Sequence, residues 1–225
     1  MQFSLLSDAL PSGIEAYRVD LDLDADLARA WPLLNDEERA AASRFRQRAD
    51  QVRSAFTRAT LRQLLAQRLD CNPLEVSLCA GTHGKPFAMN TNGVTPPLFN
   101  VSHSGAHALI AIADAKQMSA VGIDIERCDV DARMQTIVDI AFTPRERQDI
   151  AAAKDPQAAL YAQWVSKEAA LKALGVGIAT DMQSIDIGRA PDGSLAVHGS
   201  VSGWQTLRVM ALAAPAGYAA ALAWQ

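Results

Sequence analysis

The chain has 225 residues, of which 49% are hydrophobic and 20% are charged, and its formal net charge is −4. These values are typical of a globular protein with a buried core and exclude the disordered and fibrous classes. The negative net charge argues against general nucleic-acid binding. The N-terminal residues lack the basic and apolar regions of a signal peptide, and no apolar run suits a membrane helix. We therefore expect a cytoplasmic protein without a membrane segment.

Apolar periodicity and capping residues predict a first half that mixes strands with two helices. Asn35 followed by Glu38 forms a capping signature for a helix that continues to about Arg46. The other elements expected here are a strand at 14–22, a helix at 50–69, a strand at 74–80, a Gly/Pro loop at 81–87, and strands around 98–102 and 107–114.

The second half repeats this order of a strand, helices and further strands. Thr143 followed by Glu146 forms a capping box with Pro144 at the first helical position. Asp155-Pro156 opens another helix in the same way, and Gly175 marks its end. The other elements expected are a strand at 121–126, a helix at 130–142, and strands at 184–190, 194–199, 204–213 and 218–224. This order predicts an α+β protein of two similar halves, residues 1–116 and 117–225, with a ligand cleft between them.

Residues 121–126, VGIDIE, predict a strand with one apolar and one acidic face. The acidic face carries Gly122, Asp124 and Glu126. The two carboxylates would project about 6–7 Å apart. Mg²⁺ prefers oxygen ligands, so one such ion could lie between them, and Gly122 would leave room for a bulky ligand. An edge strand whose acids only discourage aggregation is the alternative.

Residues 164–175, WVSKEAALKALG, predict a helix on which Trp164, Glu168 and Lys172 lie near one face. The simpler interpretation is an exposed Glu–Lys pair that contributes little to stability. In the other interpretation, Glu168 acts at the same cation as the acids of 121–126, as a third ligand or as a base through bound water.

Three acids around one Mg²⁺ would be unusual, because this ion is normally held by one or two carboxylates together with phosphate and water. We therefore expect the phosphates of a substrate to complete the site. Several acids and a diphosphate overbalance one divalent ion, and Lys167 and Lys172 are positioned to supply the missing positive charge.

Residues 100–105, NVSHSG, place His103 at the end of a strand, between Ser102 and Ser104. A Ser–His nucleophilic pair is disfavoured, because adjacent residues of a strand face opposite ways. His103 is either a donor to a ligand phosphate or a core histidine whose hydrogen bonds are satisfied. Just upstream, residues 84–86, GKP, form a rigid loop that presents a lysine.

The segment from Arg39 to Arg68 holds eight arginines and a single acid, Asp50. One interpretation is a long solvated helix face. The other is that a few of these arginines bind a polyanionic ligand such as a nucleotide phosphate.

Together these segments resemble the 4′-phosphopantetheinyl transferase superfamily, in its larger, pseudo-dimeric, surfactin-synthetase-activating type. The resemblance lies in GKP (84–86), NVSHSG (100–105), VGIDIE (121–126), and FTPRE (142–146) followed by WVSKEAALKALG (164–175). GxDxE alone is a weak signal, but GxDxE followed about 40 residues later by WxxKEAxxK is specific.

The resemblance implies a fold of two α+β halves related by a pseudo-twofold axis, with the metal site in the C-terminal half. It implies transfer of the 4′-phosphopantetheine group from coenzyme A to a serine of an apo acyl, peptidyl or polyketide-synthase carrier protein. The reaction would depend on Mg²⁺, with Mn²⁺ as an alternative, and would release adenosine 3′,5′-bisphosphate. A monomer is expected, since one chain would supply both halves of the cleft.

Residue by residue, the resemblance implies Asp124, Glu126 and Glu168 as the magnesium ligands, and Asp124, Glu168 and Lys172 as the catalytic residues. The residues expected to contact coenzyme A are Arg53, Gly84, Lys85, Ser102, His103, Lys167 and Lys172. The acids are expected to be exposed, so that replacing Asp124 or Glu168 with alanine would leave the fold intact.

The chain departs from broad-specificity relatives, which have lysines near positions 38 and 41, where this chain has Glu38 and Ala41. Arg39, Arg44 or Arg53 would have to bind the phosphate instead. Two other functions stay open: a Mg²⁺-dependent phosphodiesterase that uses water as nucleophile, and a non-catalytic nucleotide- or CoA-binding module.

Overall fold

A computed structural model describes residues 2–7, 9–81, 84–89, 93–129, 132–176, 182–189, 195–199 and 206–225. Several predicted positions lie outside the described residues. These are residues 82–83 of the predicted loop and the ends of predicted elements at 130–131, 190, 194 and 204–205.

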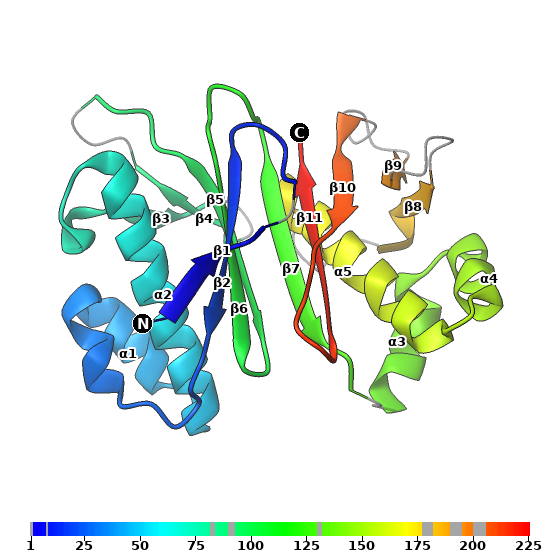
Figure 1. Cartoon of the computed structure of the whole chain (residues 1–225), viewed down its shortest axis with the longest axis horizontal. Helices are drawn as coiled ribbons and strands as arrows, with labels where there is room; N and C mark the ends of the chain where they lie inside the picture. Colours follow the sequence, from blue (N-terminus) through cyan, green and yellow to red (C-terminus); the bar gives the residue numbers. More distant parts are fainter. Residues whose placement is uncertain are drawn as a thin grey trace.

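The described strands form two large antiparallel sheets and one small one (Figure 1). The first sheet has the order β1 (Gln2–Leu5), β2 (Ile14–Asp20), β6 (His107–Ala113) and β5 (Leu98–Ser104). The second has the order β7 (Val121–Arg127), β11 (Tyr218–Trp224), β10 (Arg208–Ala211), β9 (Leu195–Gly199) and β8 (Ile185–Arg189). The small sheet pairs β3 (Leu78–Ala80) with β4 (Pro86–Ala88).

Helices flank the two sheets on opposite sides of the molecule (Figure 1). The first half contains α1 (Asp36–Ser43) and α2 (Arg48–Leu69), and the second contains α3 (Ala132–Ala141), α4 (Pro144–Ala152) and α5 (Pro156–Leu174). Each half therefore places a long helix on an antiparallel sheet, and the predicted α+β class is confirmed. None of the described helices combines the length and apolarity needed to cross a membrane.

The predicted caps form as the sequence indicates. Asn35 and Glu38 make a reciprocal capping box at α1. The Asp155 side chain accepts a hydrogen bond from the Ala158 nitrogen at the start of α5, and Gly175 ends that helix in the left-handed conformation, with φ of 69°.

Several segments differ from the expected pattern. The helix expected to continue to about Arg46 ends at Ser43, and of the described part of the strand expected at 204–213 only Arg208–Ala211 is a strand. The strand predicted at 74–80 begins as a 3₁₀ turn, Pro73–Glu75, because Asn72 and Glu75 form a second capping box, and only Leu78–Ala80 is a strand. The strands β1 and β4 were not predicted, since segments of four and three residues are too short to show a period.

The apolar face of β7 lies in a core between the two sheets. Val121, Ile123 and Ile125 are at most 1% exposed and pack in one cluster with residues of β2, β6 and β11. Two further clusters fill the space between each sheet and its helices. The other face of β7 is thus turned toward α5.

Two edge strands meet where the halves adjoin, and we call this β5–β7 contact the seam. β5 ends the order of the first sheet and β7 begins that of the second. A side chain bridges them, because the Asn100 Oδ1 accepts a hydrogen bond from the Ile123 nitrogen at 2.9 Å. The connection between β6 and β7 spans residues 114–120, and we propose that the halves join there, at 116/117.

Gly122 is the point at which α5 approaches β7. A Cβ at this position would overlap the Ala169 carbonyl oxygen and the Ala173 nitrogen of α5. The prediction that Gly122 leaves room for a ligand is therefore wrong, because the helix backbone fills that space. The close approach instead brings α5 side chains beside the acids of β7.

Candidate active site

Asp124 lies at the centre of a hydrogen-bonded cluster built by three elements. Its side chain is 2% exposed. Its Oδ1 accepts hydrogen bonds from the Ser102 hydroxyl of β5 at 2.7 Å and from the Lys172 ammonium of α5 at 2.5 Å. Lys172 also donates to the Ser102 Oγ at 2.9 Å. One carboxylate thus ties together the N-terminal sheet, the C-terminal sheet and α5.

Glu126 lies two residues further along the same face of β7. The Ser104 hydroxyl of β5 donates to its Oε2 at 2.7 Å. Burial raises the pKa of Glu126, and the charge of Asp124 adds to this, while the Ser104 bond and Lys172 lower it. β7 is an edge strand of the second sheet, as the alternative interpretation held. Its acids, however, face β5 across the seam.

Glu168 comes to this cluster from α5. Burial, helped by the charges of Asp124 and Glu126, raises the pKa of its carboxyl group from 4.5 to about 7, against the effect of Lys172. The side chains of all three acids thus lie within electrostatic range of one another. Glu168 is buried, as is Asp124, so the expectation that these acids are exposed is wrong.

The chemistry of the cluster fits a hard divalent cation. Oδ2 of Asp124 and Oε1 of Glu168 are buried acceptors without a hydrogen-bond partner, which is costly unless a cation or donor reaches them. Carboxylate oxygens are the ligands that Mg²⁺ prefers. Among the residues described, however, no three acidic, histidine or cysteine side chains are arranged closely enough to hold a metal, so the three-acid metal site stays a prediction.

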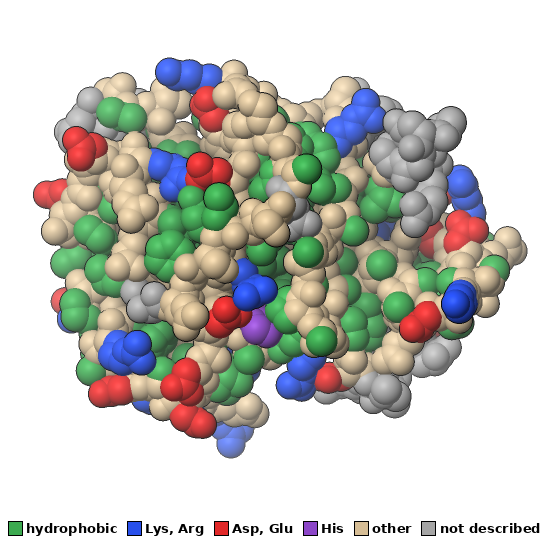
Figure 2. All heavy atoms as spheres, in the orientation of Figure 1, with side chains coloured by type: hydrophobic (Ala, Val, Ile, Leu, Met, Phe, Trp, Pro, Cys, Tyr) green, Lys and Arg blue, Asp and Glu red, His purple; other side chains and the backbone are tan. Residues whose placement is uncertain are grey.

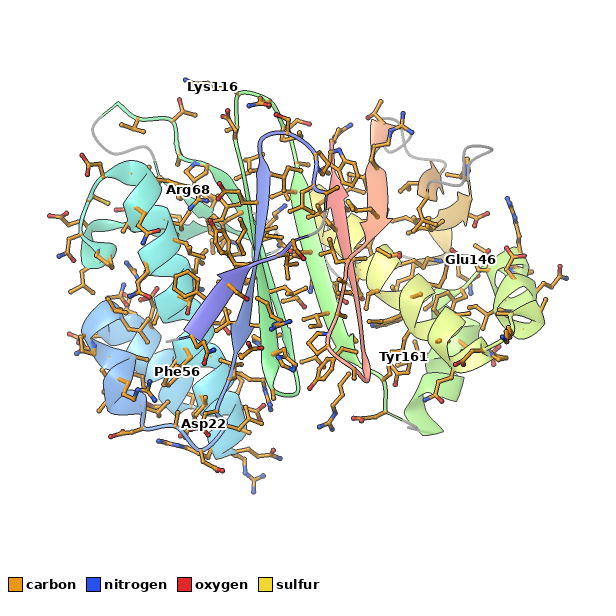
Figure 3. All side chains as sticks on the ribbon, in the orientation of Figure 1. Asp22, Phe56, Arg68, Lys116, Glu146 and Tyr161 are labelled. Carbon is orange, nitrogen blue, oxygen red and sulfur yellow. The ribbon has the colours of Figure 1, made fainter. Side chains whose placement is uncertain are left out.

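The two lysines predicted to contact the cofactor have different surroundings. Lys172 reaches the acid cluster, and its side chain is 29% exposed. Lys167 is fully buried, where its ammonium bonds the Glu146 carboxylate at 2.5 Å and the Ala141 carbonyl oxygen at 2.8 Å. Glu146 belongs to α4, beside α5 on the outer flank of the C-terminal half (Figure 3). The prediction that Lys167 binds coenzyme A is therefore wrong, because its charge is compensated inside the core.

His103 lies on the opposite face of β5 from Ser102, as strand geometry requires. Its ring is exposed and lies near Arg53 of α2. Desolvation by surrounding protein atoms lowers the pKa of His103, and the charges of Arg53 and Lys172 lower it further. The same environment of two cations would favour a bound anion.

Arg53 is fixed beside the turn at Gly105 that follows β5. It donates to the Gly105 carbonyl oxygen at 2.9 Å and to Asp50 Oδ1 at 2.5 Å, and its side chain is 17% exposed. Its contact with a phosphate stays a prediction. Ser102, also predicted to contact coenzyme A, is occupied here by Asp124 and Lys172.

Lys85 connects the two halves at the other end of β7. Its ammonium donates to the carbonyl oxygens of Val121 at 3.0 Å and Ala173 at 2.9 Å. Burial lowers its pKa from 10.5 to about 8. Gly84 precedes it in the left-handed conformation, with φ of 79°, and an added Cβ there would meet nothing within 4 Å.

A pocket of about 620 Å³ opens beside Lys85, between the two halves. Phe87 and Phe99 line it from the first half, and Val121 and Gly175 from the second. The pocket reaches β7 three residues before Asp124, a spacing of about 10 Å along a strand. A bound molecule could therefore extend from the pocket toward the acid cluster.

Most arginines of α2 take part in specific contacts, which differs from the predicted solvated face. Arg62 is 2% exposed and bonds Glu38 at 2.7 Å, together with the carbonyl oxygens of Pro73 and Val76. Arg58 lies 3.6 Å from the same carboxylate. Glu38 is thus a structural acid that caps α1 and binds α2.

Sequence reasoning missed the roles of Asn100, Ser104 and Glu146. The signal for the first two was present, because polar residues at 100, 102 and 104 alternate along one face of an apolar strand. Glu146 was recognised only as part of a capping box, which it does form with Thr143, and its bond to Lys167 needs tertiary structure.

Two family models match the chain. One, described as the 4′-phosphopantetheinyl transferase superfamily, matches residues 120–223, and another, described as 4′-phosphopantetheinyl transferase, N-terminal, matches residues 23–115. A solved structure, the holo-(acyl-carrier-protein) synthase of Bacillus anthracis str. Ames in complex with CoA (3′,5′-ADP), is similar with 19% identity and a TM-score of 0.42. That likeness covers 48% of this chain and 95% of the other.

Curated relatives match over both halves. The 4′-phosphopantetheinyl transferase HetI of Nostoc sp. is 31% identical over 191 residues, which cover 84% of this chain and 77% of HetI. The phosphopantetheinyl transferase of Thraustochytrium sp. is 30% identical over 77% of this chain, which spans 65% of that relative's length. A Synechocystis sp. relative, 31% identical over 74% of this chain, is likewise spanned over 65% of its length. The chain belongs to the 4′-phosphopantetheinyl transferase superfamily.

Proposed function

We propose that this protein transfers the 4′-phosphopantetheine group from coenzyme A to a serine of an apo carrier protein. The observation that supports this most directly is that Glu168 interacts electrostatically with Asp124, Glu126 and Lys172 at the seam between the two halves. The two family models match the sequence of the first half, over residues 23–115, and of the second half, over residues 120–223. The names of the curated relatives support the same activity.

Coenzyme A is proposed to bind across the seam. The pocket beside Lys85 offers apolar walls from both halves for the adenine base of coenzyme A. Arg53 and Lys172 offer positive charge for its phosphates, and His103 offers a ring nitrogen as a hydrogen-bond donor. The diphosphate would then lie beside Asp124 and Lys172. An uncompensated diphosphate would be repelled by three acids, so a divalent cation is required there.

Asp124, Glu126 and Glu168 would hold Mg²⁺, or Mn²⁺ in its place, together with diphosphate oxygens. Such an ion neutralises charge on the phosphates and stabilises the leaving group. Glu168 is either a ligand or the base, directly or through water. Its raised pKa is near neutrality, which suits a group that must accept a proton from a hydroxyl.

In the proposed reaction, the carrier's serine oxygen forms a bond to the phosphorus that bears the pantetheine group. The bond from that phosphorus to the bridging oxygen breaks, and adenosine 3′,5′-bisphosphate leaves. The hydroxyl proton passes to the Glu168 carboxylate or to water. Lys172 donates to the phosphate oxygens as negative charge grows on them.

The carrier itself is proposed to be an acyl, peptidyl or polyketide-synthase domain. Carrier proteins are acidic, and exposed arginines such as Arg44 and Arg46 offer complementary charge. Acidic and basic side chains are interspersed on the face in Figure 2, so no single basic patch dominates that face. We propose that one copy of the chain suffices, because both sides of the pocket come from one chain.

The test is an intact-mass measurement on a panel of apo carriers incubated with the protein, coenzyme A and Mg²⁺. We expect at least one carrier to gain the mass of phosphopantetheine, with release of adenosine 3′,5′-bisphosphate, and EDTA to stop the gain. Breakdown of coenzyme A without any carrier would indicate a phosphodiesterase instead. Binding of coenzyme A with neither outcome would indicate a non-catalytic module.

A further inference from the structure

Ser104 makes two hydrogen bonds across the seam, and each uses a different part of its hydroxyl group. Its Oγ accepts from the Arg127 nitrogen at 3.0 Å and donates to the Glu126 Oε2 at 2.7 Å. A backbone N–H cannot accept a proton, so the hydroxyl has its hydrogen free for the carboxylate. The backbone bond thus fixes the direction in which Ser104 donates.

The Ser104 bond restricts the side chain of Glu126. A glutamate side chain has three rotatable bonds and loses up to about 2 kcal/mol of conformational freedom when it is ordered. The Ser104 bond holds one carboxylate oxygen in place and leaves the second oxygen for another ligand. Ser102 and Asp124 show the same arrangement, in which Oδ1 is bonded and Oδ2 has no partner.

Asn100 provides the comparison within the same strand. It also crosses the seam, where its Oδ1 accepts a hydrogen bond from the Ile123 nitrogen of β7, and this bond involves no acid of the cluster. Asn100 and Ser104 therefore share the task of joining β5 to β7. Ser104 differs by its additional bond to Glu126.

We propose that Ser104 is a positioning residue, which orients the Glu126 carboxylate for the divalent cation. This inference rests on the metal site of the proposed function. Partners that orient metal ligands typically change metal affinity by about 10- to 100-fold when they are removed. Ser104 itself does not touch the substrate or the cation.

The test measures the affinity of the full-length chain for Mn²⁺ in the presence of coenzyme A, with electron paramagnetic resonance as the readout. We expect Ser104→Ala to weaken Mn²⁺ binding about tenfold. Ser104→Thr, which keeps the hydroxyl group, should restore most of the affinity. Ser104→Cys, with a weaker donor, should be intermediate, and it replaces the alanine variant if that variant is unstable.

Asn100→Ala is the matched control, because it removes a seam bond without touching an acid. We expect it to lower the melting temperature and to leave the Mn²⁺ affinity unchanged. Equal loss of affinity in Asn100→Ala and Ser104→Ala would reduce Ser104 to a structural role. Unchanged affinity in Ser104→Ala would overturn the positioning role alone, whereas no Mn²⁺ binding by the parent would overturn the proposed metal site as well.

Discussion

At the scale of single residues, the surroundings of a buried ionisable group decide its role. Glu168 and Lys167 are neighbours in α5, yet they point to different environments. Glu168 lies among like charges at the seam, where its pKa is raised to about 7. Lys167 lies in the core and is neutralised by Glu146, 2.5 Å away. A shared motif thus contains one residue suited to chemistry and one that supports the fold.

Glu168→Gln should change how stability depends on pH when EDTA removes divalent ions. Between pH 4.5 and 7 the folded parent keeps a proton on Glu168 that the unfolded chain has lost, so its stability falls as pH rises through this window. Glutamine has no charge to bury. The variant's advantage in unfolding free energy should grow from near zero at the lower limit to about 3 kcal/mol above pH 7.

Urea denaturation at pH 5 and pH 8 measures this difference. Glu37→Gln, an exposed acid on α1, is the control and should show little change between the two pH values. An advantage of Glu168→Gln that is the same at both pH values would contradict the raised pKa.

Lys167→Met should destabilise the fold without changing cofactor binding. The substitution leaves Glu146 as an uncompensated charge that is 1% exposed, and breaking a buried ion pair in this way costs about 3–5 kcal/mol. Arg147→Met breaks the exposed pair with Asp139 and should cost less than about 1 kcal/mol. Chemical denaturation gives both values.

Calorimetric titration with coenzyme A completes the Lys167 test. The folded Lys167→Met protein should bind coenzyme A as the parent does. A large loss of affinity with little loss of stability would restore the cofactor contact expected from the sequence.

At the scale of elements, the site depends on how closely α5 approaches β7. Gly122 permits that contact, since the backbone of α5 lies where a side chain would be. The caps at Asp155 and Gly175 fix where α5 begins and ends. Lys85 reaches across from the first half to the Val121 and Ala173 carbonyl oxygens and holds the same contact from outside.

Gly122→Ala should force α5 away from β7. Overpacking of this kind costs about 1–3 kcal/mol, and more where backbone atoms must move, as here. Gly188→Ala, in β8, is the matched control, because its added Cβ would have ordinary contacts at 3.5 Å. Thermal unfolding should separate the two variants, and equal melting temperatures would show that the α5–β7 contact is looser than described.

The sequence predicted the elements whose signals are local. The capping boxes at Asn35 and Thr143 and the αL residue Gly175 are set by neighbouring residues, and each forms as expected. The sequence could also place Asp124 and Glu126 on one face of a strand. It could not show that Gly122 faces a helix, because the occupant of a glycine's free space is set by tertiary packing.

At the scale of the whole molecule, two sheets pack face to face and their edge strands meet in one seam. The apolar face of β7 holds the halves together, and its acidic face forms the candidate site. The sequence indicated two halves and a cleft from the repeated order of elements. It could not indicate that polar side chains of β5 bridge to β7, since residues of the two strands that bond lie more than 20 positions apart.

This arrangement explains why one chain can carry the proposed reaction. Residues for the cofactor pocket come from both halves, whereas the acids come only from the second. Binding of coenzyme A across the seam should therefore add contacts between the halves. Burial makes the charge of Glu168 unfavourable, and Lys172, the partner of Asp124, is 29% exposed to water, so replacing either acid need not unfold the chain.

The most direct measurement is the rate at which Asp124→Ala and Glu168→Ala form the phosphopantetheine-modified carrier. Intact-mass spectrometry monitors this rate, and the parent is compared at an equal concentration of folded protein. The account predicts that both variants lose transfer while circular dichroism shows that they stay folded. Modification of the carrier by either folded variant at the parent's rate would contradict the claim that these acids form the catalytic centre.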